Sequence, residues 1–356
     1  MKRWIITGIV ITVVIAVCVL LYINKEKCEV IVAVSDSALP INLEKLLNLP
    51  PEELITVTNL SISYNQDIPP STTNKELKEI PPIVSQLINL KEFYCVDNEI
   101  SDLTPIKHLI HLEAINLSGN KITNLKDFEN FTNLTGLDVS NNQLTDLKGI
   151  EKLKKLQYLD LVHNHNLSDL TGIESLTNLK ELIVGYNDVK TFPDSFYTTG
   201  LPIEIIRMWK MPNFEYASNL PKFHKLKELR TFILKWNNVP VLNIDFEKCE
   251  NLETFSYSTH EEIDIADVLN RISKAPKLDY LILSDNNIRY LPENIVLPDS
   301  LEVLHLSHNK IKRLPMNITK YKKLKSVHLH SNPIDTIAIK KIEKAMVNTE
   351  FHYDKR

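Results

Sequence analysis

Apolar residues return at a fixed spacing along most of the chain, in the frame LxxLxLxxNxLxxL. The first full copy begins at Leu90, with Phe93 and Cys95 at its central apolar positions and Asn98 at its polar one. Later copies begin at Leu112, Leu134, Leu156, Leu179, Leu229, Leu252, Leu278, Leu301 and Leu324. A self-similar period of 20–50 residues indicates a solenoid rather than a globular core.

The central LxL segment of each copy alternates apolar and intervening residues, which is typical of a strand with one face buried. One repeat cannot bury its leucines alone, so neighbouring repeats must stack and share one core. We therefore predict an α/β solenoid with a parallel sheet on its concave face and short helices and loops on its convex face. The recurring asparagine is predicted to be buried and to bond backbone groups of adjacent turns.

This frame resembles that of the leucine-rich repeat family. The stretch LTGLDVSNNQLTDLKGIEKL is similar to the 22-residue, internalin-like bacterial class, whereas YLPENI and RLPMNI resemble the 23-residue class with Leu-Pro after the turn. The resemblance covers residues 54–336. It implies the horseshoe fold of the family and a role in recognising other proteins.

The amino end has a different pattern. Lys2 and Arg3 precede an uncharged, mainly apolar run from Trp4 to Ile23, which is long enough to span a bilayer as a helix. We predict a short basic N-terminus at 1–3 and a signal-anchor helix at 4–23, not cleaved after Cys18. The positive charges slightly favour a cytoplasmic N-terminus and an extracytoplasmic C-terminal part, with the opposite orientation left open.

The remaining segments are assigned around this frame. Residues 24–53 are predicted to form a juxtamembrane segment and N-terminal cap, residues 54–336 the repeats, and residues 337–356 a C-terminal cap whose Ile339, Ile342 and Met346 share a helical face. The stretch after His260 has helical spacing and is predicted to form a convex-side helix. Residues 201–214 read as a degenerate repeat in which Met211 replaces the asparagine.

The amino-acid composition argues against several classes of function. A net charge of −4 argues against a nucleic-acid partner, and the seven glycines form no phosphate-binding loop, so no cofactor is indicated. None of the four cysteines forms a CxxC pair, and the frame places Cys95 and Cys249 in the core. Together with the absence of a catalytic motif, this predicts a protein that is not an enzyme.

Equal positions of stacked repeats should form rows across the concave face, and three groups emerge from these rows. Asp138 and Asp160 neighbour each other in one row, and His305 and His328 do so near the C-terminal end. A central aromatic and basic group comprises Tyr186, Arg207, Trp209, Lys210, Lys235 and Trp236. Because Trp, Tyr and Arg dominate interface hot spots, this group is the best candidate for partner binding.

Three functions are consistent with this arrangement. The first is membrane-anchored recognition of a protein partner through the concave face, as in adhesion. The second is carbohydrate or cell-wall binding, with the aromatic side chains as stacking platforms. The third is metal-dependent hydrolysis at the histidines, although the concave rows hold no nearby acidic or cysteine ligand, so no metal site is assigned. A binding rim that responds to pH near neutrality is another reading of the same histidines.

Overall fold

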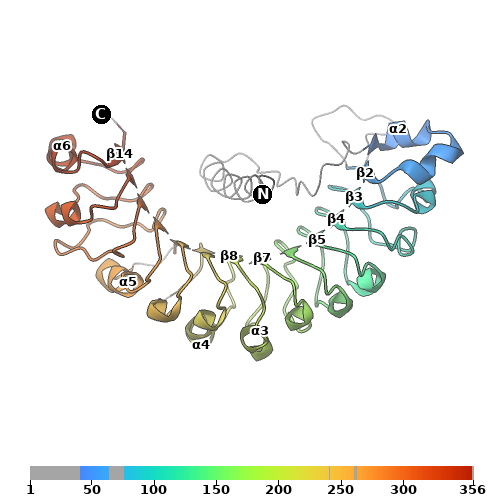
Figure 1. Ribbon diagram of the computed structural model, residues 1–356, viewed down its shortest axis with the longest axis horizontal. Coiled ribbons are helices and arrows are strands. Elements are labelled where there is room, and N and C mark those ends of the chain that lie inside the picture. Colours follow the sequence, from blue (N-terminus) through green and yellow to red (C-terminus); the bar gives the residue numbers. More distant parts are fainter. Residues whose placement is uncertain (1–40, 64–75, 240, 260–262, 355–356) are drawn as a thin grey trace, which may run out of the picture. The chain divides into compact units, whose positions relative to one another are not determined.

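The computed structural model describes residues 41–63, 76–239, 241–259 and 263–354, all within the compact unit of residues 39–356. These residues form one fourteen-stranded parallel sheet whose strands follow chain order (Figure 1). The strands are β1 (Ile41–Asn42), β2 (Asn59–Ser61), β3 (Glu92–Tyr94), β4 (Ala114–Asn116), β5 (Gly136–Asp138), β6 (Tyr158–Asp160), β7 (Glu181–Gly185), β8 (Ile205–Trp209), β9 (Thr231–Lys235), β10 (Thr254–Tyr257), β11 (Tyr280–Ile282), β12 (Val303–His305), β13 (Ser326–His328) and β14 (Glu350–His352).

The pairing register confirms the predicted repeat frame. Asp138 pairs with Asp160, Arg207 with Ile233, and His305 with His328, so each predicted row is a row of neighbouring strand positions. The degenerate repeat at 201–214 also keeps the frame, because β8 lies between β7 and β9 and Met211 is fully buried.

Short helices cover the outer side of this unit, opposite the strands (Figure 1). The α-helices are α2 (Leu43–Leu47), α3 (Asp194–Thr198), α4 (Tyr216–Asn219), α5 (Ile265–Ile272) and α6 (Thr336–Ala345). The 3₁₀ helices are η1 (Pro51–Thr56), η2 (Pro82–Gln86), η3 (Lys126–Asn130), η4 (Ile150–Lys152), η5 (Ile173–Ser175), η6 (Leu220–Lys225), η7 (Phe246–Lys248) and η8 (Met316–Lys320). Helix α5 is the convex-side helix predicted after His260.

A ladder of buried asparagines joins the repeats, as predicted. Asn120 is typical: its Nδ2 donates to the carbonyl oxygens of Cys95 and Leu117, and its Oδ1 accepts from the backbone N–H of Ile100. The same pattern links Asn142 to Leu117 and Ile122 in the neighbouring repeat. Each asparagine thus satisfies backbone groups that would otherwise be buried without partners.

Where the asparagine is missing, a tyrosine compensates. Met211 has no polar side chain, and the Tyr216 hydroxyl lies 3.0 Å from the Met211 carbonyl oxygen and 2.6 Å from Asn237 Oδ1. The backbone N–H of Met211 donates to the same Asn237 oxygen. The ladder therefore continues through the degenerate repeat.

Both ends of the shared core are covered. At the amino end, α2 buries Leu43 and Leu46. At the carboxyl end, α6 buries Ile339 and Ile342, and Met346 is also buried, which confirms the predicted apolar face. Strand β14 then adds one further strand beyond the last repeat, which the frame did not predict.

Two cysteines lie in the core as predicted. Cys95 and Cys249 are buried and form no disulfide among the residues that the structure describes, and burial raises the pKa of each thiol to about 12. A thiol in this state is a poor nucleophile.

The predicted membrane span at 4–23 lies outside the described residues. Among the helices that the structure describes, none combines the length and the apolar character needed to span a bilayer.

Candidate binding surface

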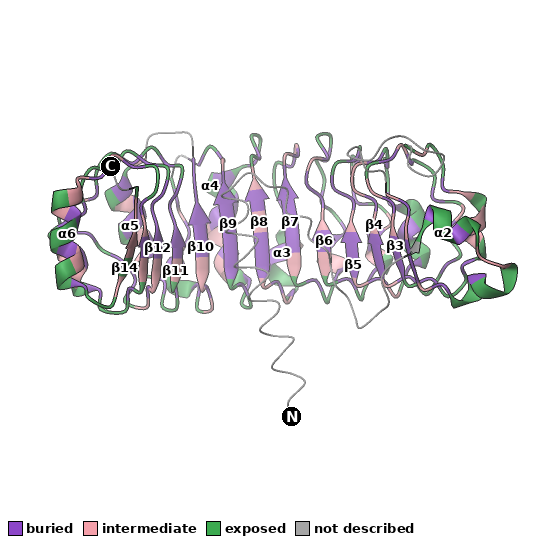
Figure 2. Ribbon diagram, turned by 90° about the horizontal axis from the view of Figure 1, so that it is seen from above, coloured by how far each residue is buried: buried purple, intermediate pink, exposed green. Residues whose placement is uncertain are grey.

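The concave face is the surface onto which Figure 2 looks, and its central strands are the longest. Strands β7, β8 and β9 have five residues each, and β9 is buried along its whole length. The middle of the face therefore offers more paired strand than either end, and it carries the predicted aromatic and basic residues.

A second regularity lies at the edge of this face. At the residue immediately before each position of the asparagine ladder, the backbone has a positive φ, which residues other than glycine rarely adopt. Nine residues other than glycine share this position: Asp97, Asn141, His163, Tyr186, Lys210, Trp236, Asp285, His308 and Ser331. We call this set the left-handed row, and it contains three of the predicted binding residues.

Asn116, Asp138 and Asp160 form the acidic row on β4, β5 and β6. In each case the side-chain Oδ1 accepts a hydrogen bond from the backbone N–H two residues later, at 2.9 Å. These side chains thus cap the carboxyl ends of very short strands, a local bond that Asn and Asp commonly make. This gives the acidic row a structural role that needs no ligand.

The two carboxyl groups of the acidic row affect each other. Burial raises the pKa of Asp138, and burial together with the neighbouring Asp138 charge raises the pKa of Asp160 to about 8. Two adjacent carboxylates cannot both ionise cheaply, so one proton is retained near neutral pH. Arg207 acts in the opposite direction on Asp160.

The six predicted central residues, which we call the central patch, do not all have the same environment. Tyr186 stacks on His163 with ring centroids 4.0 Å apart, and the Lys210 ammonium lies 5.4 Å from the Tyr186 ring centre. His163, Tyr186 and Lys210 are consecutive members of the left-handed row, so the Tyr186 ring is held between its two neighbours. His163 therefore extends the central patch by one repeat.

Arg207 and Lys235 are less accessible than the sequence suggested. Arg207 forms an ion pair with Glu181 on β7, and only 13% of its side chain is exposed. Lys235 is 9% exposed. The rings of Trp209 and Trp236 are half-buried, so these two residues and Tyr186 supply the aromatic surface of the patch.

The β7 and β8 backbones approach closely beneath this patch. A Cβ atom on Gly185 would lie 2.6 Å from the Trp209 carbonyl oxygen. Glycine at this position therefore permits the close spacing of β7 and β8 at Trp209.

The histidines form a continuous stack, which we call the histidine ladder. His305 stacks on His328 at 3.8 Å, and His328 stacks on His352 at 4.5 Å. Tyr280 caps the inner end, with its hydroxyl 2.7 Å from His305 Nε2. His352, on the unforeseen strand β14, was absent from the sequence-based cluster.

Burial and like charges lower the pKa of the two inner histidines of this ladder. The pKa of His305 is lowered to about 3, mainly by burial, and that of His328 to about 4 for the same reason. A rim that titrates near neutrality is therefore not supported at these two positions. Their Nε2 atoms are also engaged, by Tyr280 and by the hydroxyl of Ser326.

No set of three or more His, Cys, Asp or Glu side chains is arranged to hold a metal ion in the described ranges. Acidic residues do approach the histidines, contrary to the sequence expectation, because the C-terminal segment returns to the face: Asp354 lies 3.0 Å from His330 Nδ1, and Glu350 lies 3.5 Å from His352 Nε2.

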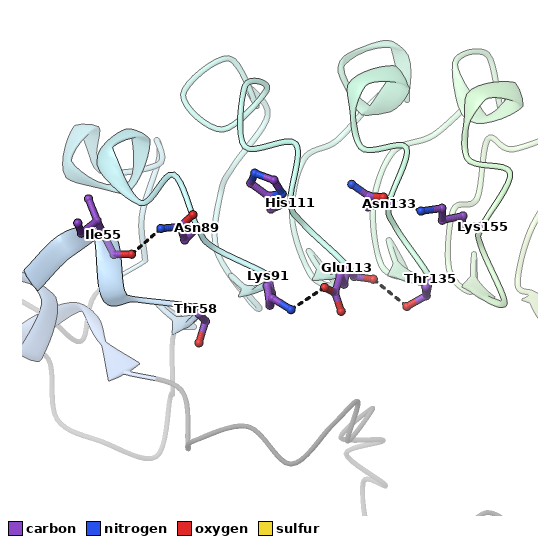
Figure 3. Close-up of a pocket in the computed structure, with 9 residues that line it drawn as sticks. All are labelled: Ile55, Thr58, Asn89, Lys91, His111, Glu113, Asn133, Thr135 and Lys155. Atoms are coloured by element: carbon purple, nitrogen blue, oxygen red, sulfur yellow. Dashed lines mark hydrogen bonds and ion pairs between the residues drawn. The ribbon is translucent and has the colours of Figure 1, made fainter.

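A separate hollow of about 640 Å³ lies beside the amino-terminal repeats (Figure 3). Its polar groups largely bond one another: Lys91 pairs with Glu113 at 2.9 Å, Lys155 donates to Asn133, and Thr135 donates to the Glu113 carbonyl oxygen. Most of its polar groups are therefore already satisfied.

Sequence reasoning missed one whole row of the concave face. Glu92, Tyr158, Glu181 and Tyr280 occupy the position before the first leucine of LxL, and they face the same side as the predicted rows. The signal was available, because side chains two positions apart on a strand share a face. Including that row would have placed Glu181 diagonally across from Arg207, within reach of the ion pair that they form.

Residues 88–130, 132–175 and 299–341 match the family described as Leucine Rich repeats (2 copies). An internalin (inlF) from Listeria monocytogenes is similar in structure, with a TM-score of 0.60 and 19% identity over 88% of this chain and 93% of that one. A leucine-rich repeat protein of Leptospira interrogans gives a TM-score of 0.54 and 23% identity over 88% and 94%. The leucine-rich repeat domain of APL1B gives 0.53 and 19% over 81% and 88%. No curated protein matches the chain.

Proposed function

Since the matched segments are leucine-rich repeats, we propose that this protein binds a protein partner through its concave face, centred on the central patch. Solenoids of this kind are typically non-enzymatic scaffolds that present extended concave surfaces. The observation that carries the proposal is the grouping of Tyr186, Trp209 and Trp236, all half-buried, over the longest strands of the sheet. Aromatic side chains in such settings are the commonest binding hot spots.

The environment of Tyr186 favours a protein partner over a carbohydrate. Sugar rings stack on an open aromatic face, whereas His163 and Lys210, from the two adjoining repeats, both contact the Tyr186 ring. The Tyr186 ring is thus held between these two side chains and does not offer an open face to a sugar. A glycan array probed with the purified protein tests this directly, and strong binding to a defined sugar would favour the carbohydrate alternative.

The partner site is tested by substituting the two tryptophans together. Partners are captured by crosslinking to the full chain in its native membrane, and the affinity of each captured partner is then measured. Trp209→Ala with Trp236→Ala should weaken binding by roughly 30-fold if one ring is a hot spot and by up to roughly 1,000-fold if both are, since each hot-spot ring contributes about 2 kcal/mol. Tyr290→Ala is the matched control, because Tyr290 is 72% exposed and lies outside the concave rows.

Retained folding of the double variant is checked by circular dichroism. If the folded double variant binds every captured partner as tightly as the unaltered chain, the central patch is not the binding site.

We also propose that residues 4–23 anchor the protein in a membrane, with the repeats outside the cytoplasm. The support is the uncharged, mainly apolar run of Trp4–Ile23. Carbonate-washed membranes should retain the full chain and lose a variant that lacks residues 4–23. Protease added to intact cells or spheroplasts should digest the repeats if they face outward and spare them if they face the cytoplasm.

A further inference from the structure

Lys235 is the last residue of β9 and lies on the concave face, because Phe232 and Leu234 on the same strand point into the core. In its row it pairs with Trp209 on β8. On the other side the register continues to Ser258, whose backbone N–H donates to the Leu234 carbonyl oxygen. Lys235 therefore lies between an aromatic side chain and a short hydroxyl.

The ammonium group of Lys235 is buried without a counterpart. With only 9% of the residue exposed, Nζ makes no hydrogen bond or ion pair to any residue in the described ranges. Arg207, on the neighbouring strand, contrasts with it because Arg207 pairs with Glu181. Burial lowers the pKa of Lys235, and the charge of Asp285 only partly offsets this effect. A buried cation of this kind is costly unless something pairs with it.

Neighbouring hydroxyl groups are also unsatisfied. The buried Oγ atoms of Ser256 on β10 and of Ser284, just beyond β11, have no hydrogen-bond partner within the part of the chain that the structure describes. Ser258 Oγ accepts from the backbone N–H of Trp236 and still has its own hydrogen to donate. Buried polar groups in native proteins are nearly always bonded, so an ammonium and several free hydroxyls together indicate a missing acceptor.

We propose that Lys235, with the hydroxyls of Ser256 and Ser258, binds the carboxylate of an aspartate or glutamate side chain of the protein partner. This inference rests on the proposed function and names the chemistry that the partner must present. A carboxylate accepts up to about four hydrogen bonds, which matches one ammonium and adjacent hydroxyl donors. The apolar neighbours Ile233 and Ile282 exclude water and strengthen the pairing.

The charge of the site favours a carboxylate over a phosphate group. Only one unpaired ammonium faces the site, and the nearby Asp285 carboxylate opposes further negative charge. A phosphate monoester carries a charge of about −1.5 to −2 near neutral pH and is usually held by several cations or by a bidentate arginine. Arg207, the nearest candidate, is already paired with Glu181.

Acetate is a direct probe of this site, and tryptophan is a convenient reporter. The chain has three tryptophans, of which Trp209 and Trp236 adjoin Lys235 in the row and in the chain. In the full chain labelled with ¹⁵N-tryptophan, acetate should shift the indole signals of both residues saturably, relative to chloride at equal ionic strength. The Trp4 signal should not move.

Lys235→Met should abolish the saturable shift. Lys248→Met is the matched control and should retain it, because Lys248 is exposed and pairs with Asp245 in the same repeat. Ser258→Ala, a milder change, should weaken acetate binding by roughly 2- to 10-fold. An absent acetate shift in the unaltered chain, or an equal shift in folded Lys235→Met, would overturn the proposal. Inorganic phosphate that binds more than tenfold tighter than acetate would overturn the carboxylate assignment.

Different experimental outcomes would overturn the central patch as the partner site and Lys235 as the carboxylate site. Suppose that the tryptophan substitutions leave the affinity for captured partners unchanged, while acetate binding still requires Lys235. The carboxylate site then stands, and the proposed location of partner binding is wrong. If the tryptophan substitutions abolish capture while Lys235→Met changes neither acetate response nor partner affinity, the central patch stands and the carboxylate site is wrong.

Discussion

His305 and His328 lie opposite each other on β12 and β13, with ring centroids 3.8 Å apart and planes within 3°. Such close parallel stacking is compatible with two neutral imidazoles and is opposed by two imidazolium charges. The lowered pKa values, about 3 and about 4, agree with this arrangement.

His305 and His328 should therefore remain neutral at physiological pH, and the protein should lose stability in acid. Unfolded histidines have a pKa of about 6.5, so the unfolded chain takes up protons first as pH falls. The free energy of unfolding should decrease from about pH 6.5 downward through about pH 3, and His305→Phe should reduce this dependence. NMR titration of His305 provides the measurement, and a midpoint near 6 or above would contradict the prediction.

The acidic row predicts the opposite pH dependence. A carboxyl whose pKa is raised on folding stabilises the native state while protonated, and this contribution is lost as pH rises. For Asp160 the loss should extend from about pH 4, its unfolded pKa, to about pH 8. Asp160→Asn should remove most of this slope in urea unfolding measured across that range. An unchanged slope would mean that Asp160 ionises freely.

The asparagine ladder should contribute measurably to stability. Asn142→Ala leaves the buried N–H of Ile122 without its side-chain acceptor and removes one of the two side-chain hydrogen bonds that the Leu117 carbonyl oxygen accepts. A cost of about 1–3 kcal/mol in the free energy of unfolding is expected. Asn133→Ala serves as a control, since Asn133 also donates to a backbone carbonyl but in an exposed position. Equal losses in both variants would show that burial of the ladder is not what matters.

Gly185 should be intolerant of any side chain. The added Cβ of Gly185→Ala meets the Trp209 carbonyl oxygen at 2.6 Å, so β7 and β8 must separate, at about 1–3 kcal/mol. Gly200→Ala controls for backbone strain, because Gly200 has a positive φ but nothing within 4 Å of its added Cβ. Thermal unfolding of both variants distinguishes the two effects, and Gly185→Ala should be the more destabilised.

The repeat frame predicted the order and register of the strands because one short pattern dictates both. Each LxL fixes which residues face the core, and stacking then fixes the rows, so the pairing of Asp138 with Asp160 followed from the spacing alone. Strand β14 escaped prediction because its sequence carries no LxL. The repeat pattern therefore did not predict that His352 would be part of the histidine ladder.

The electrostatic character of the site was harder to predict. A row identifies neighbours but not which charges pair, so Arg207 looked available although Glu181 neutralises it. Likewise, two histidines near the surface of a repeat suggested titration near neutrality, whereas burial of His305 lowers its pKa. Burial and charge pairing depend on all three concave rows together, and the sequence prediction left out the row that holds Glu181.

The left-handed row has a consequence for how such a protein changes over time. Each of these backbone turns immediately precedes a ladder position, and residues as different as His163, Lys210 and Trp236 adopt it. Each such non-glycine residue carries a conformational cost of about 1–2 kcal/mol, which the ladder offsets irrespective of side-chain identity. This edge can therefore exchange one side chain for another without altering the path of the chain, and it is where new specificities can arise by single substitutions.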